Sequence, residues 1–167
     1  MKLGYEVVSV DGLSVKDVGE EMHHYTSGLP LYVNAVKERM KAKFTLREAF
    51  LIETLFKGGV VYNACRYKLD SSLGRARGKA LLFSILKILC KSNGLRLNEI
   101  SKLLYRSSAV TKNLLERLIS VDLVVKEGNL YSFSDSVLRF WFKSFVDEVE
   151  FDFVPDKNTL KKIEVDM

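Results

Sequence analysis

The sequence predicts a mainly α-helical fold, and three observations support that prediction. Apolar residues recur at the spacing of amphipathic helices through most of the 167 residues. Capping patterns precede two of these segments, where Ser14 is followed by Asp17 and Thr45 by Glu48. The composition, 47% hydrophobic and 28% charged, is typical of a globular protein that buries a sizeable core. A chain of this length forms one domain of ordinary size or two small ones.

The first part of the chain, residues 1–70, is predicted to form a small helical region. An alternating run at Tyr5–Val10 has the pattern of a short strand. Ser27-Gly28 ends the first predicted helix, Pro30 suits the first turn of the next, and Gly58-Gly59 interrupts the third. The predicted helices are Val15–Tyr25, Leu31–Met40, Leu46–Lys57 and Val60–Leu69.

Residues 71–78 are predicted to form a linker, because two glycines and several basic side chains interrupt the apolar period there. This linker would separate the helical region from a second domain over residues 79–149. Residues 150–167 would follow as a C-terminal tail. The second domain opens with a helix at Lys79–Lys91 that is apolar nearly all round, which is typical of a helix buried on most sides.

Two amphipathic helices and a hairpin follow that apolar helix. The helices are predicted over Leu97–Leu104 and Ser108–Ser120. Their apolar side chains, including Leu103, Val110 and Ile119, are expected to face the core. The predicted strands are Leu123–Lys126 and Leu130–Phe133, joined by the turn Glu127-Gly128-Asn129. The order helix–helix–helix–strand–strand is that of a winged helix-turn-helix with a two-stranded β wing.

A closing helix rich in aromatic residues completes the second domain. Its sequence begins Phe133-Ser134-Asp135-Ser136-Val137-Leu138-Arg139-Phe140-Trp141-Phe142, with Ser134 or Asp135 as the cap. The aromatic side chains could form a stacking platform for bases. Their helical spacing favours the alternative, a place in the core. Because apolar residues occupy two neighbouring stripes, this helix is expected to be clamped between two surfaces.

Charge and composition narrow the classes of function. The net charge of +5 permits contact with nucleic acid without implying it. Two cysteines, Cys65 and Cys90, indicate neither a disulfide framework nor a zinc site, which favours a reducing, cytoplasmic setting. They are expected to be packing residues. Adjacent His23 and His24 point about 100° apart on a helix and would make a poor metal pair. No apolar run is long enough to span a bilayer.

Motifs for phosphate binding and hydrolysis are missing from the sequence. No G-x-x-x-x-G-K-[ST] or G-x-G-x-x-G string occurs, and Gly58-Gly59 lacks the lysine and hydroxyl that a phosphate-cradling loop requires. Carboxylates show no paired arrangement of the kind used for acid–base catalysis. We therefore expect this chain not to be an enzyme on its own.

The exposed face of the predicted helix-turn-helix holds the candidate contact residues. In such a motif the second helix enters the major groove with its early residues at the base edges. The candidates are Arg106, Ser107, Ser108, Thr111, Lys112, Asn113 and Arg117, with Lys126 and Asn129 on the wing. Arginine, asparagine and lysine suit bases and phosphates of double-stranded DNA. A neighbouring protein domain is the alternative partner, and a plain solvated face is a third interpretation.

Two segments resemble a known protein family. Ser27-Gly28-Leu29-Pro30-Leu31-Tyr32-Val33, followed by a winged helix ending in Phe133–Phe142, is similar to the C-terminal half of the archaeal P-loop ATPases, which are AAA+-related and STAND-like. The family pattern is a G-G-x-P turn in a helical lid and a closing F-x-x-x-D-P-x-L-R-F-W-F. Here Ser27 replaces the first glycine and Ser136 the proline.

The resemblance implies a helical lid remnant followed by a winged helix, and a particular setting for both. Gly28 and Pro30 would lie near the adenine of a nucleotide held, with Mg²⁺, by an ATPase core domain in cis or trans. That core is absent here, which would make the chain an excised fragment or a truncated or split gene product. The implied function is a non-catalytic regulatory or interaction region of an archaeal-type ATPase. A free-standing winged-helix transcriptional regulator is the alternative.

Overall fold

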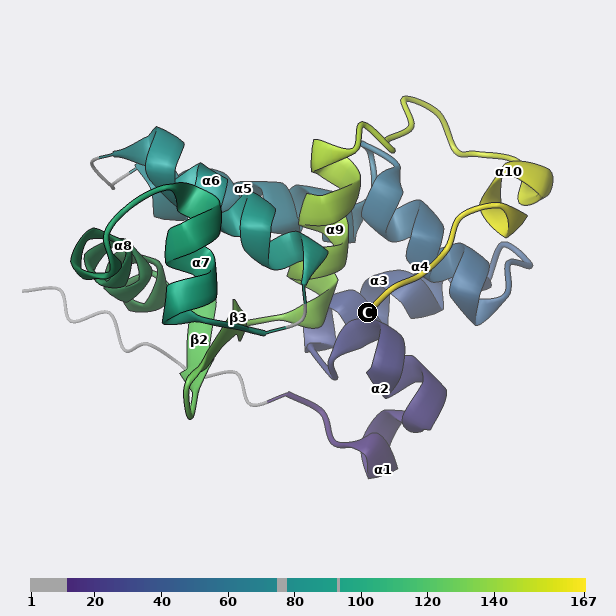
Figure 1. Ribbon diagram of the computed structural model, residues 1–167. Coiled ribbons are helices and arrows are strands. Elements are labelled where there is room, and N and C mark those ends of the chain that lie inside the picture. Colours follow the sequence, from purple (N-terminus) through teal and green to yellow (C-terminus); the bar gives the residue numbers. More distant parts are fainter. Residues whose placement is uncertain (1–11, 75–77, 93) are drawn as a thin grey trace, which may run out of the picture.

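The computed structural model describes residues 12–74, 78–92 and 94–167, and this part of the chain is mainly helical with a small antiparallel sheet (Figure 1). The predicted mainly α class is therefore confirmed. The strand expected at Tyr5–Val10 lies outside the described residues. Apolar residues from both parts of the chain join one hydrophobic core, which runs from Met22 to Leu160.

Short helices make up the first part of the chain. They are α1 (Val15–Val18), α2 (Glu20–Thr26), α3 (Pro30–Met40), α4 (Leu46–Leu55) and α5 (Val60–Gly74). The single helix predicted over Val15–Tyr25 is two, because Gly19 adopts φ +85° between α1 and α2. The capping box of Thr45 and Glu48 at the start of α4 is present as predicted.

Helix α5 is longer than the apolar pattern indicated, and the predicted linker begins inside it. Residues 71–74 form its last turn. Leu69 and Leu73 lie one turn apart on the same face, and both are buried. Packing of this face against the core therefore continues the helix to Gly74, inside the segment predicted as a linker.

The second part of the chain contains the sheet. Its elements are α6 (Lys79–Lys91), β1 (Leu95–Arg96), α7 (Leu97–Leu104), α8 (Ser108–Ser120), β2 (Val124–Glu127), β3 (Leu130–Phe133) and α9 (Ser136–Val146). The two strands predicted as a wing belong, in the described residues, to a three-stranded antiparallel sheet with the order β1-β3-β2. Leu95 pairs with Tyr131 and Arg96 with Leu130. A strand of two residues is too short to show an alternating pattern, so β1 was missed.

Helix α9 is packed between two layers, as its two apolar stripes predicted. On one side, Phe140 lies 5.5 Å from Phe50 of α4 between ring centroids, and Trp141 lies 5.8 Å from Tyr62 of α5. On the other side, Phe142 lies 5.2 Å from the ring of Phe83 in α6. Figure 1 shows α9 running between the first helices and the part that contains the sheet. The aromatic string is core, and the interpretation as a stacking platform is wrong.

The C-terminal tail packs on the rest of the protein. Phe151 forms a parallel bridge with Phe56, and helix α10 (Lys157–Lys161) lies against α4. The Arg47 guanidinium donates to the carbonyl of Leu160 at 3.1 Å and to that of Ile163. These contacts tie the end of the chain to the first helices.

Candidate interaction surface

Helices α7 and α8 meet at a three-residue turn. Tyr105 ends α7 in the left-handed region with φ +54°, and the Arg106 amide donates to the carbonyl of Ser101 at 3.1 Å. Ser107 caps α8, its hydroxyl accepting from the Val110 amide at 3.4 Å. The two helices are therefore joined as tightly as the Tyr105-Arg106-Ser107 connection indicated. We call this region the α7–α8 corner.

Most of the predicted contact residues do lie on the surface. Arg117 is half-buried, and the exposed members of the set are Arg106, Ser107, Ser108, Lys112, Asn113, Lys126 and Asn129. Thr111 was wrongly placed on the solvent side: it is fully buried, and its hydroxyl donates to the Ser107 carbonyl at 3.0 Å. It lies one turn before Leu115, on the inward face of α8. This spacing was the signal that could have identified it.

Three apolar side chains expected in the core lie outside it. Leu103 is 55% exposed, Val110 42% and Ile119 37%. Their helices bury narrower stripes, in which Ser101 and Thr111 take inward positions by donating their hydroxyls to backbone carbonyls one turn earlier. The surface around the α7–α8 corner is therefore more apolar than the sequence pattern indicated.

A polar hollow of about 540 Å³ lies between the start of α7, helix α8 and the sheet. We call it the wing hollow. Its lining residues are Arg96, Leu97, Asn98, Lys112, Lys126, Asn129 and Tyr131. Three of them are cations, and among the described lining residues there is no carboxylate. Lys126 lies over the Tyr131 ring, with its Nζ atom 5.7 Å from the centroid, which keeps the ammonium at the edge of the hollow.

A second hollow, of about 550 Å³, adjoins the wing hollow at the α7–α8 corner. Asn98 lines both, and Arg106, Lys102 and Tyr105 line the second. Acidic residues nearby are partly engaged. Glu99 accepts from the Arg96 amide at 2.7 Å, and Glu116 lies 3.8 Å from Lys112. The two hollows share Asn98, and the described residues that line each of them include cations but no carboxylate.

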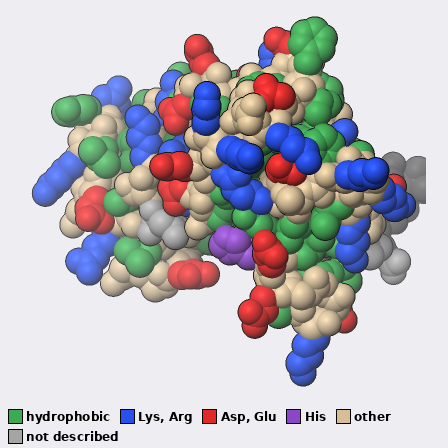
Figure 2. Space-filling model, turned by 90° about the vertical axis from the view of Figure 1, so that its right-hand side faces the viewer, with side chains coloured by type: hydrophobic (Ala, Val, Ile, Leu, Met, Phe, Trp, Pro, Cys, Tyr) green, Lys and Arg blue, Asp and Glu red, His purple; other side chains and the backbone are tan. Residues whose placement is uncertain are grey.

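Positive charge alone does not distinguish this face. Figure 2 shows the side of the molecule that carries the right-hand helices of Figure 1, including α10, and Lys and Arg side chains gather there as well, interspersed with Asp and Glu. The α7–α8 corner differs in its shape and in the chemistry of the wing hollow, which combines cations with amide side chains. Those features, rather than the net charge, make it the candidate site.

The other predicted site residues, Gly28 and Pro30, lie in the turn between α2 and α3. Pro30 is the first residue of α3. Gly28 is buried with φ +67°, and a Cβ atom there would lie 2.1 Å from the carbonyl oxygen of Leu13, so only glycine fits. The Leu13 amide donates to the Gly28 carbonyl at 2.7 Å. In this structure Gly28 allows the backbone of the turn between α2 and α3 to approach the backbone of Leu13 closely.

The same turn contacts the start of α9, which sequence reasoning missed. The hydroxyl oxygens of Ser27 and Ser136 lie 3.0 Å apart, and the Tyr32 hydroxyl donates to the carboxylate of Asp135 at 3.4 Å. Asp135 caps α9 by accepting from the Val137 amide at 2.9 Å. These partners are over a hundred residues apart in the chain, so no local pattern could indicate them.

The buried side chains around this contact titrate away from their ordinary ranges. Burial raises the pKa of the Asp135 carboxyl, although the hydrogen bond from the Val137 amide opposes that shift. Burial also raises the pKa of the nearby Cys65 thiol to about 12, so this cysteine stays a thiol at neutral pH. Both cysteines are buried, as expected of packing residues.

The described residues hold no cluster of three or more histidine, cysteine or acidic side chains that could bind a metal ion. His24 is exposed and His23 half-buried. Across the described part of the chain, no helix has the length and apolar character needed to cross a bilayer.

Comparisons with known proteins found no matching family model, curated protein or solved structure. The resemblance to archaeal ATPases thus stays a prediction from two sequence segments.

Proposed function

We propose that this chain is a non-catalytic interaction region in which residues 79–149 form a winged helix that contacts double-stranded DNA. The observation that supports this proposal is the wing hollow, where Arg96, Lys112 and Lys126 converge beside α8 without a described carboxylate among the lining residues. A cationic groove between a recognition helix and a β-ribbon suits a phosphate backbone, whose negative charges favour clustered lysine and arginine.

Each group on the face has a role in this proposal. Lys112 and Lys126 contact phosphates from the two sides of the wing hollow, which positions the protein on the duplex. Arg106 and Asn113 are exposed on the corner and on α8, where they reach base edges in the major groove. Asn129, at the tip of the hairpin, extends the contact to the neighbouring backbone.

A salt-dependent titration of the full chain with a DNA duplex tests this proposal. Arg106→Ala combined with Lys112→Ala should weaken binding and reduce the slope of log K against log salt by about 0.9, since each phosphate contact contributes about 0.9 and Lys112 is the proposed phosphate contact of the two. The matched control is Lys161→Ala combined with Lys162→Ala, which removes two exposed cations near α10. Equal losses in both double variants, or no duplex binding at low salt, would exclude the α7–α8 corner as a DNA site.

We further propose that this interaction region is the regulatory region of an archaeal-type ATPase. The contacts of Ser27 with Ser136 and of Tyr32 with Asp135 support it, because they join the two segments that resemble the family. A change at the turn before α3 would reach the start of α9 directly through these contacts. ATP and Mg²⁺ would be held by a core domain supplied in cis or trans.

A free-standing DNA-binding regulator is the alternative setting, and the two are separable by experiment. A regulator that reads two half-sites would form a two-fold dimer with recognition helices about 34 Å apart. An ATPase regulatory region would instead bind a core domain that carries a G-x-x-x-x-G-K-[ST] motif. Sedimentation of the chain, alone and with such a core, distinguishes these outcomes. ATP hydrolysis by this chain alone would contradict the non-catalytic proposal.

A further inference from the structure

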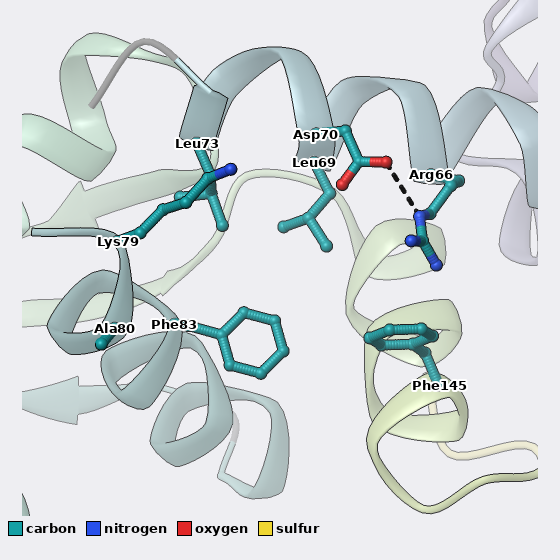
Figure 3. Close-up of a pocket in the computed structure, with 8 residues that line it drawn as sticks. All are labelled: Arg66, Leu69, Asp70, Leu73, Lys79, Ala80, Phe83 and Phe145. Atoms are coloured by element: carbon teal, nitrogen blue, oxygen red, sulfur yellow. Dashed lines mark hydrogen bonds and ion pairs between the residues drawn. The ribbon is translucent and has the colours of Figure 1, made fainter. Parts of the chain in front are cut away.

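An apolar pocket of about 450 Å³ lies between α5, α6 and α9, away from the wing hollow (Figure 3). We call it the α5–α6–α9 pocket. Leu69 and Leu73 of α5 form one wall, Ala80 and Phe83 of α6 a second, and Phe145 of α9 the third. Its volume is within the range of about 300–1,000 Å³ that is usual for small-molecule sites. Nothing in the proposed DNA contact uses this pocket.

Charged side chains stand only at the rim of this pocket among its described residues. Arg66 and Asp70 pair with each other, with Nε and Oδ2 2.9 Å apart, and the Arg66 guanidinium lies 5.1 Å from the centroid of the Phe145 ring. The carboxylate of Asp70 thus has a cation of the same helix as its partner. Lys79, at the opposite side of the pocket in Figure 3, is exposed, and its ammonium group has no ion pair or hydrogen bond with any described residue.

We propose that the α5–α6–α9 pocket binds a small aromatic carboxylate, with its ring between Phe83 and Phe145 and its carboxylate at Lys79. The apolar walls favour a hydrophobic body, and the two phenyl groups on opposite walls suit an aromatic one, which can meet them edge-to-face or in offset stacks. The lining carries one cation in excess, which favours a single negative charge on the ligand.

The rings of Phe83 and Phe145 are held in position by contacts with aromatic side chains of the hydrophobic core. Phe83 packs on Phe142 at 5.2 Å, and Phe145 stacks on Trp141 at 5.4 Å, between ring centroids. Both rings therefore stay in place without a ligand, and little conformational entropy is lost when one binds. Lys79 begins α6, where a positive charge is unfavourable to the helix dipole. A bound carboxylate would offset that charge.

Calorimetric titration of the full chain with naphthoate tests the proposal, with naphthalenemethanol and naphthylmethylammonium as probes of the same ring system. We expect saturable binding of one naphthoate, weaker binding of the alcohol and the weakest binding of the ammonium. Lys79→Gln should weaken naphthoate binding about threefold, as for an exposed charge pair, and should leave the alcohol unchanged. Lys91→Gln, at the other end of α6, is the matched control and should change neither.

Ala80→Trp supplies a second, independent test, because it fills the pocket without removing a core contact. It should abolish binding of all three probes while the thermal unfolding of the chain stays near that of the unmodified protein. Equal binding of the three probes would overturn the carboxylate assignment. Absence of saturable naphthoate binding, or unchanged binding in Ala80→Trp, would overturn the site. None of these titrations contains DNA, so their failure leaves the proposed DNA contact unaffected.

Discussion

Helices α8 and α9 are similar in length, but Lys112 of α8 and Arg139 of α9 lie in opposite environments. In α9, the side chain of Arg139 is 5% exposed, and its guanidinium donates to the Cys90 carbonyl at 3.3 Å and to the Asp166 carbonyl at 3.1 Å. In α8, Lys112 is exposed, and its Nζ atom lies 3.8 Å from the carboxylate of Glu116, which is exposed as well. A buried arginine with partners in its own chain serves the fold. Lys112, which is exposed beside the wing hollow, is accessible to another molecule.

The same contrast holds for the aromatic and apolar residues of the two helices. Trp141 and Phe142 of α9 are 1% and 0% exposed, whereas Val110 and Ile119 of α8 reach 42% and 37%. Helix α9 therefore stabilises the protein, and α8 is positioned by it through α6 and the sheet. If this division is right, substitutions in α9 should lower stability, and substitutions on the outer face of α8 should change binding alone.

The largest expected effect is on the free energy of unfolding, from Trp141→Ala. The indole is buried against Tyr62 and stacks on Phe145, so its removal should cost about 3–5 kcal/mol. Urea denaturation followed by circular dichroism measures this. Phe153→Ala is the control, since Phe153 is 84% exposed and its loss should change stability by at most about 0.5 kcal/mol. Similar values for the two variants would contradict the assignment of α9 to the core.

Arg139→Ala should lower stability by a smaller amount, about 1–3 kcal/mol, because it leaves the buried carbonyl of Cys90 without this donor. Asp166, the ionic partner, has 62% of its side chain exposed and is solvated by water after the loss. The comparison is with Arg106→Ala, which should leave the unfolding free energy nearly unchanged. If Arg106→Ala were as destabilising as Arg139→Ala, the exposed cation would be part of the fold and not of a binding surface.

Local signals in the sequence were sufficient to predict most helix boundaries. They were insufficient to predict the tertiary contacts between the helices and strands. Helices α6, α7 and α8 begin and end at the predicted residues, because apolar period and capping are properties of neighbouring residues. Strand β1 was missed because it exists only through its pairing with Tyr131 and Leu130. The burial of Thr111 depends equally on what packs against its helix.

The candidate site was predictable to a similar degree. Residue types and helix order predicted that Arg106, Lys112 and Asn113 are exposed, and all three are exposed in the structure. The wing hollow needed Arg96 and Tyr131 as well, and these join it only when β1 pairs with β3. The contact between Ser27 and Ser136 spans most of the chain, and the α5–α6–α9 pocket combines three separate helices. These are tertiary contacts between segments far apart in the chain, and they cannot be predicted from the local pattern of a single sequence.

The smallest expected effect is a change in the pH dependence of stability, and it compares two helix caps. Asp135 caps α9 inside the protein, and burial raises the pKa of its carboxyl. For an acid whose pKa is raised by folding, the folded state binds the proton more strongly, so this stabilisation is present at low pH and is lost as pH rises through the folded pKa. Asp135→Asn keeps a capping side chain but removes the titration. The variant should therefore gain stability relative to the unmodified protein as pH rises.

Asp156 provides the matched cap with the opposite sign. It caps α10 at the surface, where backbone hydrogen bonds from Thr159 and Asn158 and the Thr159 hydroxyl lower its pKa. Its stabilisation is present above the unfolded pKa and is lost as pH falls, so Asp156→Asn should lose stability relative to the unmodified protein as pH rises. Urea denaturation of both variants across the acidic to neutral range measures the two slopes. Slopes of the same sign would mean that burial does not govern the Asp135 carboxylate, and the cap of α9 would then resemble an exposed one.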